Sequence, residues 1–317
     1  MTADPWDAFD PEDEADADAR IGELRELCGH GCPEELRFEV FGELGLLLGW
    51  RYGAAGDEAD LDEAIAALRT AGDASAPPDA EPAWIDVEIA RLLVVRADAT
   101  GSPADVEAAI TRAETALAVL VPPEDGPDPD FAMLFHVLGI AHAQRAWQAP
   151  ADTEKTPSRA EAEHGGAEKA PGGAEEALAL AAGAFRRALA LLPSPHPFTA
   201  EVTARLGVVL AATLRRDMDR LGDAVWRRQE EWTELSGRAT DALRTLEAGW
   251  SALPDGHPYR PIARSGWASC AQSASPCSAA ASRTRRRRWP TWRRSSNCPA
   301  ATTAWRTSAT SSSRSCT

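Results

Sequence analysis

The sequence lacks any apolar run long enough to cross a membrane, because no stretch approaches the ~20 consecutive apolar residues that a spanning helix needs. A secretory signal is also missing. The N-terminus, MTADPWDAFDPEDEADADAR, is acidic and contains neither a basic region nor an apolar region. We therefore expect a cytoplasmic protein without a membrane partner.

Cysteine is scarce: four of the six cysteines lie after residue 265, which leaves only Cys28 and Cys32 before it. Two thiols do not make a disulfide framework. They stand in the segment CGHGC with His30 between them, and two interpretations are open. A zinc site would need a further ligand or two, and C-x3-C around a histidine is not a standard spacing. A Gly-rich turn that ends the first helix needs no ligand, and it is the structure we expect.

Sequence motifs of catalysis and of phosphate binding are absent. The nucleophile motif G-x-S-x-G does not occur, and neither Gly56-Asp57 nor Gly101-Ser102 belongs to a G-x-x-x-x-G-K-[ST] or G-x-G-x-x-G pattern. We therefore expect no enzyme activity, no catalytic, cofactor-binding or metal-ligating residues, and no cofactor.

The remaining histidines do not form a ligand pattern. His136 and His142 are six residues apart, so they do not share a helix face as residues at i and i+4 would. We expect both to be ordinary helix-face residues, and we expect His196 and His257 to be turn residues.

Acidic residues and helical periodicity dominate what is present. Residues 1–265 carry all 49 Asp and Glu against 24 Lys and Arg, a balance that repels nucleic acid. Residues 1–18 are acidic and poor in aliphatic side chains, so we expect them to be disordered. From about Ile21 to Leu253, apolar residues recur at i, i+3, i+4 and i+7 without any strand pattern. This periodicity predicts an all-α fold over a domain of residues 19–265.

The helical segments repeat. GDEADLDEAIAAL (56–68) and GSPADVEAAITRA (101–113) share G-x-x-A-D-[LV]-[DE]-x-A-I at an offset of 45 residues. Leu47-Leu48 and Leu92-Leu93, in the apolar helix before each motif, match at the same offset. The pattern predicts helical hairpins, each made of a helix A, a turn at the glycine, and a helix B with acids in its first turn.

A second motif, L-P-x-x-H-P followed by an aromatic residue, marks the junctions between hairpins at 192–198 and 253–259. Leu-Gly pairs recur in the A helices, where a small residue allows close approach of a neighbouring helix; they lie at Leu44-Gly45, Leu138-Gly139 and Leu206-Gly207.

We predict four hairpins, near 35–80, 82–122, 129–193 and 198–253. The third is interrupted by a low-complexity insert over 149–173 that we expect to be a flexible loop. Because a single hairpin cannot bury its apolar stripe, we expect stacking into an α-solenoid.

The last segment, residues 266–317, contains nine arginines and no Asp, Glu, Leu, Ile, Val, Phe or Met. Its stretch SRTRRRRWPTWRRSSNC (282–298) is typical of a basic nucleic-acid-binding tail. A shifted reading frame explains the composition better. Back-translation that joins the third base of each codon to the next two turns residues 266–270 into a new Leu-Gly pair of an A helix. We expect 266–317 to be frameshifted and disordered, with no nucleic-acid partner; a genuine basic tail is the alternative.

The turn-helix motif and the L-P-x-x-H-P junction, at roughly 45-residue spacing, resemble the tetratricopeptide-like repeats of GC-rich bacteria that commonly precede a caspase-like CHAT peptidase domain. The resemblance covers about Pro33–Ser265. It departs from the standard pattern, because the repeats exceed 34 residues and the W-x2-L-G-x2-Y signature is reduced to Leu-Gly pairs. The family's catalytic His and Cys would lie in a C-terminal domain that this sequence lacks, so no catalytic residue carries over.

These observations predict a non-catalytic scaffold that binds a protein or peptide, the truncated regulatory part of a larger protein. The alternative is the N-terminal part of a CHAT-type cysteine peptidase whose catalytic domain is missing. Trp50, Trp84 and Trp147 fall in the A helices, where they either fill the inter-helix core, as we expect, or line a peptide groove. We also expect self-association through a fourth hairpin left uncapped by the tail.

Overall fold

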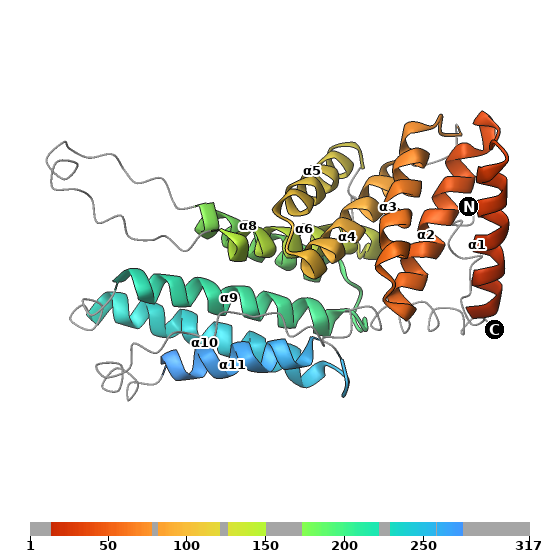
Figure 1. The fold of residues 1–317 in the computed structure, drawn as a ribbon. Coiled ribbons are helices and arrows are strands. Elements are labelled where there is room, and N and C mark those ends of the chain that lie inside the picture. The colour runs from red at the N-terminus through yellow and green to blue at the C-terminus, as the bar shows by residue number, and fades with distance from the viewer. Residues whose placement is uncertain are drawn as a thin grey trace, which may run out of the picture. The chain divides into compact units, whose positions relative to one another are not determined.

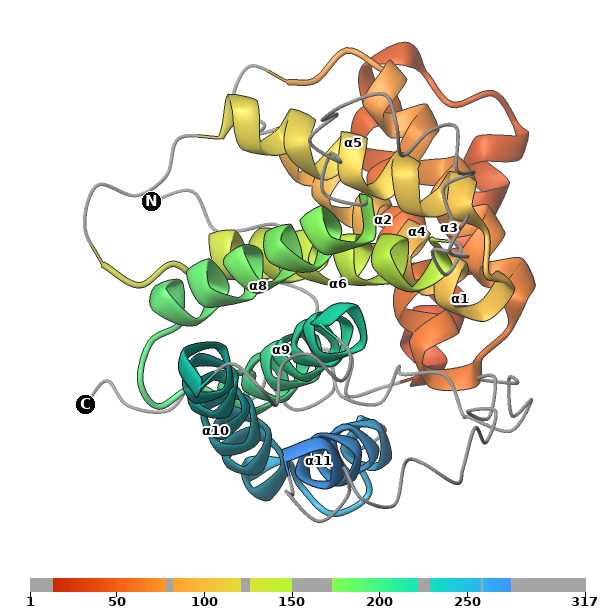
Figure 2. The same cartoon turned by 90° about the vertical axis from the view of Figure 1, so that its left-hand side faces the viewer.

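The computed structural model describes residues 14–77, 82–120, 126–149, 173–221, 229–257 and 259–274 (Figures 1 and 2). Within these ranges the secondary structure consists of ten α-helices and one short 3-10 helix, without a strand. The prediction of an all-α fold is confirmed. The elements are α1 (Glu14–Gly29), η1 (Glu34–Leu36), α2 (Arg37–Ala55), α3 (Glu58–Asp73), α4 (Ala83–Thr100), α5 (Pro103–Val119), α6 (Pro129–Gln148), α8 (Gly173–Leu191), α9 (Thr199–Leu221), α10 (Gln229–Ala252) and α11 (Arg260–Ala274).

The described helices fall into two compact units. The first holds α1 to α4 and the part of α5 from Ala108 on, and the second holds Gly101–Glu107 together with α6 and α8 to α11. The pairs α2/α3, α4/α5, α6/α8 and α9/α10 lie within the four predicted hairpin ranges. None of the described helices is both long and apolar enough to span a membrane.

The first unit is built from helices that pack on their neighbours in the chain. Helix α2 packs against α1 and α3, α3 packs against α4, and α2 also touches α4. The seams are apolar because the periodic Leu and Ile side chains face inward; fully buried examples are Leu48, Ile65, Leu68, Ile89 and Leu93. Burying each such side chain stabilises the fold by about 1.5–3 kcal/mol.

The second unit follows the same order of packing. Helix α6 packs against α8, α8 against α9, and α9 against α10, with a smaller contact between α6 and α9. Helix α11 packs on both α9 and α10, and the three run side by side in Figure 1. Leu246 of α10 is completely buried in the cluster that joins these helices.

Helix α1 begins before the end of the segment 1–18 that we expected to be disordered. Its first residue is Glu14. The helix persists there because Ala17 is fully buried and Asp18 forms an ion pair with Arg51 at 2.8 Å. Residues 1–13 lie outside the described residues.

Helix α11 likewise continues past residue 266, where we expected a disordered tail, and ends at Ala274. The indole of Trp267 lies 6.4 Å from that of Trp250, measured between ring centroids, and packs on the cluster around Leu246. The fourth hairpin is therefore covered by α11 and is not bare as we expected. The insert over 150–172 and residues 275–317 lie outside the described residues.

Candidate functional site

The glycines of the Leu-Gly pairs lie at close approaches between the two helices of three hairpins. In each, a Cβ added to the glycine would lie less than 3.0 Å from a large side chain of helix B, five or six residues before that helix ends; the pairs are Gly45 with Leu68, Gly139 with Phe185 and Gly207 with Leu246. In α4 and α5 the positions 45 residues after Gly45 and Leu68 are Ala90 and Ala113, both fully buried. The three hairpins with a Leu-Gly pair therefore share one packing register, and the equivalent positions of α4 and α5 carry small buried residues.

The turns between helices A and B also repeat. Gly56 and Gly101 have φ angles of 76° and 73°, a left-handed conformation that favours glycine. Asp57 then accepts a hydrogen bond from the Ala59 N–H at 3.0 Å, and Ser102 accepts one from the Asp105 N–H at 3.3 Å. Each side chain caps the following helix and occupies one of the backbone N–H donors that an anion would use.

An ion pair joins each helix A to the helix before it. An arginine in the last turns of helix A meets an acid among the first five residues of the preceding helix; the pairs are Arg51 with Asp18, Arg96 with Asp62, Arg145 with Glu107 and Arg220 with Glu175. The first two measure 2.8 Å. Asp62 and Glu107 are themselves 45 residues apart, so the contact belongs to the repeat.

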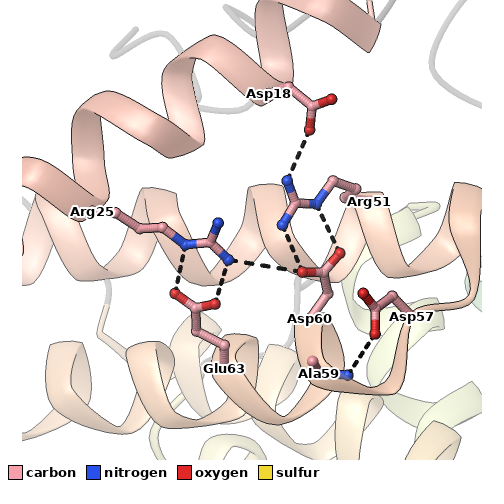
Figure 3. Close-up of polar contacts among 7 residues, drawn as sticks. All are labelled: Asp18, Arg25, Arg51, Asp57, Ala59, Asp60 and Glu63. Carbon is pink, nitrogen blue, oxygen red and sulfur yellow. Dashed lines mark hydrogen bonds and ion pairs between the residues drawn. The ribbon is translucent and has the colours of Figure 1, made fainter.

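The first of these pairs extends into a network around Asp60, shown in Figure 3. Arg51 donates Nε–H and Nη2–H to the two carboxylate oxygens of Asp60 at 2.7 and 2.6 Å. Arg25 of α1 pairs with Glu63 and lies 3.8 Å from Asp60. The hydrogen bonds to Asp60 raise the pKa of the Arg51 guanidinium above its usual value. The network ties α1, α2 and α3 together, and its carboxylates are all committed to arginines.

A half-exposed face runs along α2 and recurs on α4. On α2 it consists of Glu39, Glu43, Leu46 and Trp50, and 45 residues later on α4 it consists of Trp84, Glu88, Arg91 and Val95; all but the exposed Glu39 are partly buried. The two helices lie against each other here. A Cβ on Gly42 would be 3.4 Å from Trp84, and a Cβ on Gly49 would be 3.2 Å from Leu92. We call these eight residues the A-helix face.

Of the three A-helix tryptophans, Trp84 takes the predicted role in the core between helices, and the other two are partly or largely exposed. Trp84 packs edge-on against Phe38, at 6.3 Å between ring centroids, and against Gly42, so it fills the contact between helices. Trp50 is partly buried on the A-helix face, and Trp147 is 51% exposed near the end of α6.

The segment CGHGC forms the predicted turn. Helix α1 ends at Gly29, and Gly31 adopts a φ of 88°. The Nδ1–H of His30 donates a hydrogen bond to the Glu26 carbonyl at 2.7 Å. Cys28 is half-buried, and burial raises the pKa of its thiol. Over the residues that the structure describes, no three His, Cys, Asp or Glu side chains are grouped as a metal site would require.

Of the five histidines after residue 100, His164 lies outside the described residues, and the other four divide into two kinds. His196 and His257 are turn residues, as predicted: Nδ1 of each accepts a hydrogen bond from the N–H of the aromatic residue two positions later, at 3.3 and 3.2 Å. His136 and His142 lie on α6, and both are buried. Burial lowers the pKa of both imidazoles, that of His136 to about 3.

The sequence analysis did not identify one polar pair: the buried Glu201 and the partly buried Arg205 of α9 form an ion pair at 2.8 Å. The only local signal is their i,i+4 spacing, which is also the spacing of ion pairs on solvent-exposed helix surfaces. Comparison of the sequence and the structure with protein-family models, curated proteins and solved structures finds no match.

Proposed function

We propose that this chain is a non-catalytic scaffold, an α-solenoid of tetratricopeptide-like hairpins that binds a protein or peptide on its A-helix face. The observation that carries the proposal is the recurrence of the half-exposed residues of α2, 45 residues later, on α4. A face repeated in register from one hairpin to the next presents one continuous surface to an elongated ligand, which is how helical repeats recognise partners.

Packing within each unit supports the solenoid. In both units a helix A touches its own helix B, its helix B touches the next helix A, and successive A helices touch each other. The register of the last contact is the same when the hairpins are aligned on Gly45, Gly139 and Gly207 and on Ala90, which stands at the equivalent position of α4. Gly42 meets Trp84 in one unit, and the equivalent His136 meets Glu201 in the other.

The chemistry of the A-helix face fits a peptide. Leu46, Trp50 and Val95 offer partly exposed apolar surface, and Glu88 and Arg91 form an ion pair at 2.7 Å between them. The apolar side chains of an extended or helical peptide would pack against Leu46, Trp50 and Val95. The polar groups of the peptide would contact Glu88 and Arg91.

Photo-crosslinking tests the proposal. A photoreactive phenylalanine analogue replaces Leu46 or Val95 in the full chain, and Arg69, which is exposed on the helix B α3, carries it as the control. We expect defined polypeptide adducts in the native cell from positions 46 and 95 that position 69 does not give. The same adducts from all three positions, or none from any, contradict binding at this face.

The second candidate, the N-terminal part of a CHAT-type cysteine peptidase, draws support from the tail, whose composition differs from that of residues 1–265. Its test is the nucleotide sequence around codon 265. A one-base correction that opens a long frame encoding a His and Cys pair favours the peptidase, whereas an early stop in the shifted frame contradicts it.

A further inference from the structure

A histidine with two unused nitrogens lies in the core of the second unit. His136 of α6 is only 2% exposed, and neither Nδ1 nor Nε2 has a hydrogen-bond partner. Its ring lies between Phe185 of α8 and Phe198, at centroid distances of 5.8 and 4.4 Å. The site is therefore built for the neutral, apolar form of the imidazole.

The charged groups that face this ring come from α9. His136 Nε2 lies 3.9 Å from Oε1 of Glu201, an oxygen that already accepts a hydrogen bond from Arg205 at 2.8 Å. The other oxygen of Glu201 lies 3.6 Å from Nε2 of His257, which belongs to the turn before α11. From α8 the facing side chain is Phe185, which carries no charge.

Protonation of His136 is costly in this arrangement. Glu201 and Arg205 neutralise each other, so a proton on the buried His136 would add a second cation beside one carboxylate where little water can solvate it. Burial is the larger cause of the low pKa of His136, and the positive charge of Arg205 lowers it further. The ring accepts a proton readily only when the contact between α6 and α9 opens and water reaches it.

The direction of the pH effect follows from linkage. Because the pKa of His136 in the closed contact is below its ordinary value of 6.5, its contribution to stability is complete above pH 6.5 and is lost as the pH falls below it. The pKa of Glu201 is also lowered, by Arg205 and the two histidines, from an ordinary value of 4.5. The stability that Glu201 contributes is therefore lost only below about pH 4.5. Between pH 6.5 and pH 4.5, the loss of stability comes from histidine.

We propose that the contact of His136 with the Glu201–Arg205 pair is an acid-released joint, which opens between α6 and α9 when His136 takes up a proton. When α2 and α9 are aligned on Gly45 and Gly207, Glu201 occupies the position that Glu39 has on the A-helix face. Opening of the joint at low pH would therefore change the side of α9 that corresponds to the A-helix face. The joint is a property of the second unit and does not depend on which partner the scaffold binds.

Hydrogen exchange of the full chain, followed by mass spectrometry, tests the joint. Protection factors are corrected for intrinsic rates at pH 7.0 and pH 4.5. Each pH unit below 6.5 favours the open form tenfold, so protection of peptides from α6 and the first half of α9 should fall about 100-fold. Peptides from α2 and α3, whose interface contains no histidine, should change less than about threefold.

The variant His136→Phe keeps an aromatic ring next to Phe185 and Phe198. It should abolish the loss of hydrogen-exchange protection in α9 between pH 7.0 and pH 4.5. The control His142→Phe changes the other buried histidine of α6, whose charged neighbours are Arg145 and Glu107, and should leave the fall in α9 intact. An equal fall in α9 for wild type and His136→Phe overturns the proposal.

Should His136→Phe not fold, an NMR titration of the wild-type imidazole decides the matter. The proposal requires that His136 stay neutral in every molecule whose α9 amides remain protected. Titration near pH 6.5 with α9 protection unchanged overturns it.

Discussion

The guanidinium of Arg51, near the end of α2, holds both carboxylate oxygens of Asp60, in the first turn of α3, at 2.7 and 2.6 Å. The same guanidinium reaches Asp18 of α1 at 2.8 Å. One side chain thus joins three helices of the first unit. Because the side chain of Asp60 is only 7% exposed, water cannot replace Arg51 as its partner.

Replacing Asp60 by alanine should therefore destabilise the first unit. The change leaves Arg51 partly buried without its main counter-ion, and we expect the free energy of unfolding to fall by roughly 2–3 kcal/mol. Urea unfolding followed by circular dichroism measures it. The control Asp62→Ala removes a carboxylate whose side chain is 67% exposed and should cost less than about 1 kcal/mol. Equal losses for the two variants would show that burial of Asp60 does not matter.

Adding a methyl group at Gly139 should disrupt the third hairpin. The new Cβ would lie 2.6 Å from Cε1 of Phe185, a rigid ring that cannot move aside without repacking. We expect Gly139→Ala to cost about 1–3 kcal/mol, and Phe185→Leu in the same chain to recover part of that loss. Gly183, on α8, has open space around its Cα, so Gly183→Ala should be neutral or stabilising by up to about 1 kcal/mol. Thermal unfolding of the three variants separates packing from helix propensity.

Removing the carboxylate of Glu201 should destabilise the second unit at neutral pH. In Glu201→Gln the largely buried Arg205 loses its counter-ion, which we expect to cost roughly 3 kcal/mol. The pKa of Glu201 is lowered in the fold, so wild type loses this stability as the pH falls below 4.5, and the gap between wild type and variant should narrow there. Unfolding free energies at pH 7 and pH 3.5 measure the gap. Glu230→Gln, at an exposed position on α10, is the matched control and should differ little from wild type at either pH.

Two deletions distinguish α11 from the rest of the C-terminal segment. Deleting residues 275–317 should leave the helical circular-dichroism signal and the unfolding midpoint unchanged. Deleting 266–317 also removes Trp267 from its contact with Trp250 and should lower the stability by about 1–2 kcal/mol. If both deletions leave the midpoint where it is, the packing of Trp267 contributes nothing.

The helices and their pairing were predictable because their signals are local. Apolar spacing, the turn glycines Gly56 and Gly101 and the junction histidines His196 and His257 each act within a few residues, and the structure places all of them as predicted. Helix ends were less predictable. Helix α1 starts earlier than predicted because Asp18 forms an ion pair with Arg51. Helix α11 continues further than predicted because Trp267 packs against Trp250.

The buried polar cluster could not be predicted from local pattern. His136 and Glu201 are 65 residues apart, and only the packing of α6 on α9 brings them together. The same holds for the A-helix face. The offset of 45 residues was visible, but which side of α2 stays half-exposed depends on how α1, α3 and α4 cover the rest.

The most direct test of the scaffold is the affinity of the full chain for a polypeptide captured by crosslinking at position 46 or 95. Isothermal titration compares wild type, the double variant Leu46→Ala and Val95→Ala, and the control Arg69→Ala. Loss of two partly exposed apolar side chains from the A-helix face should raise Kd at least about tenfold, and the control should leave Kd unchanged. A double variant that binds as tightly as wild type would contradict recognition at the A-helix face.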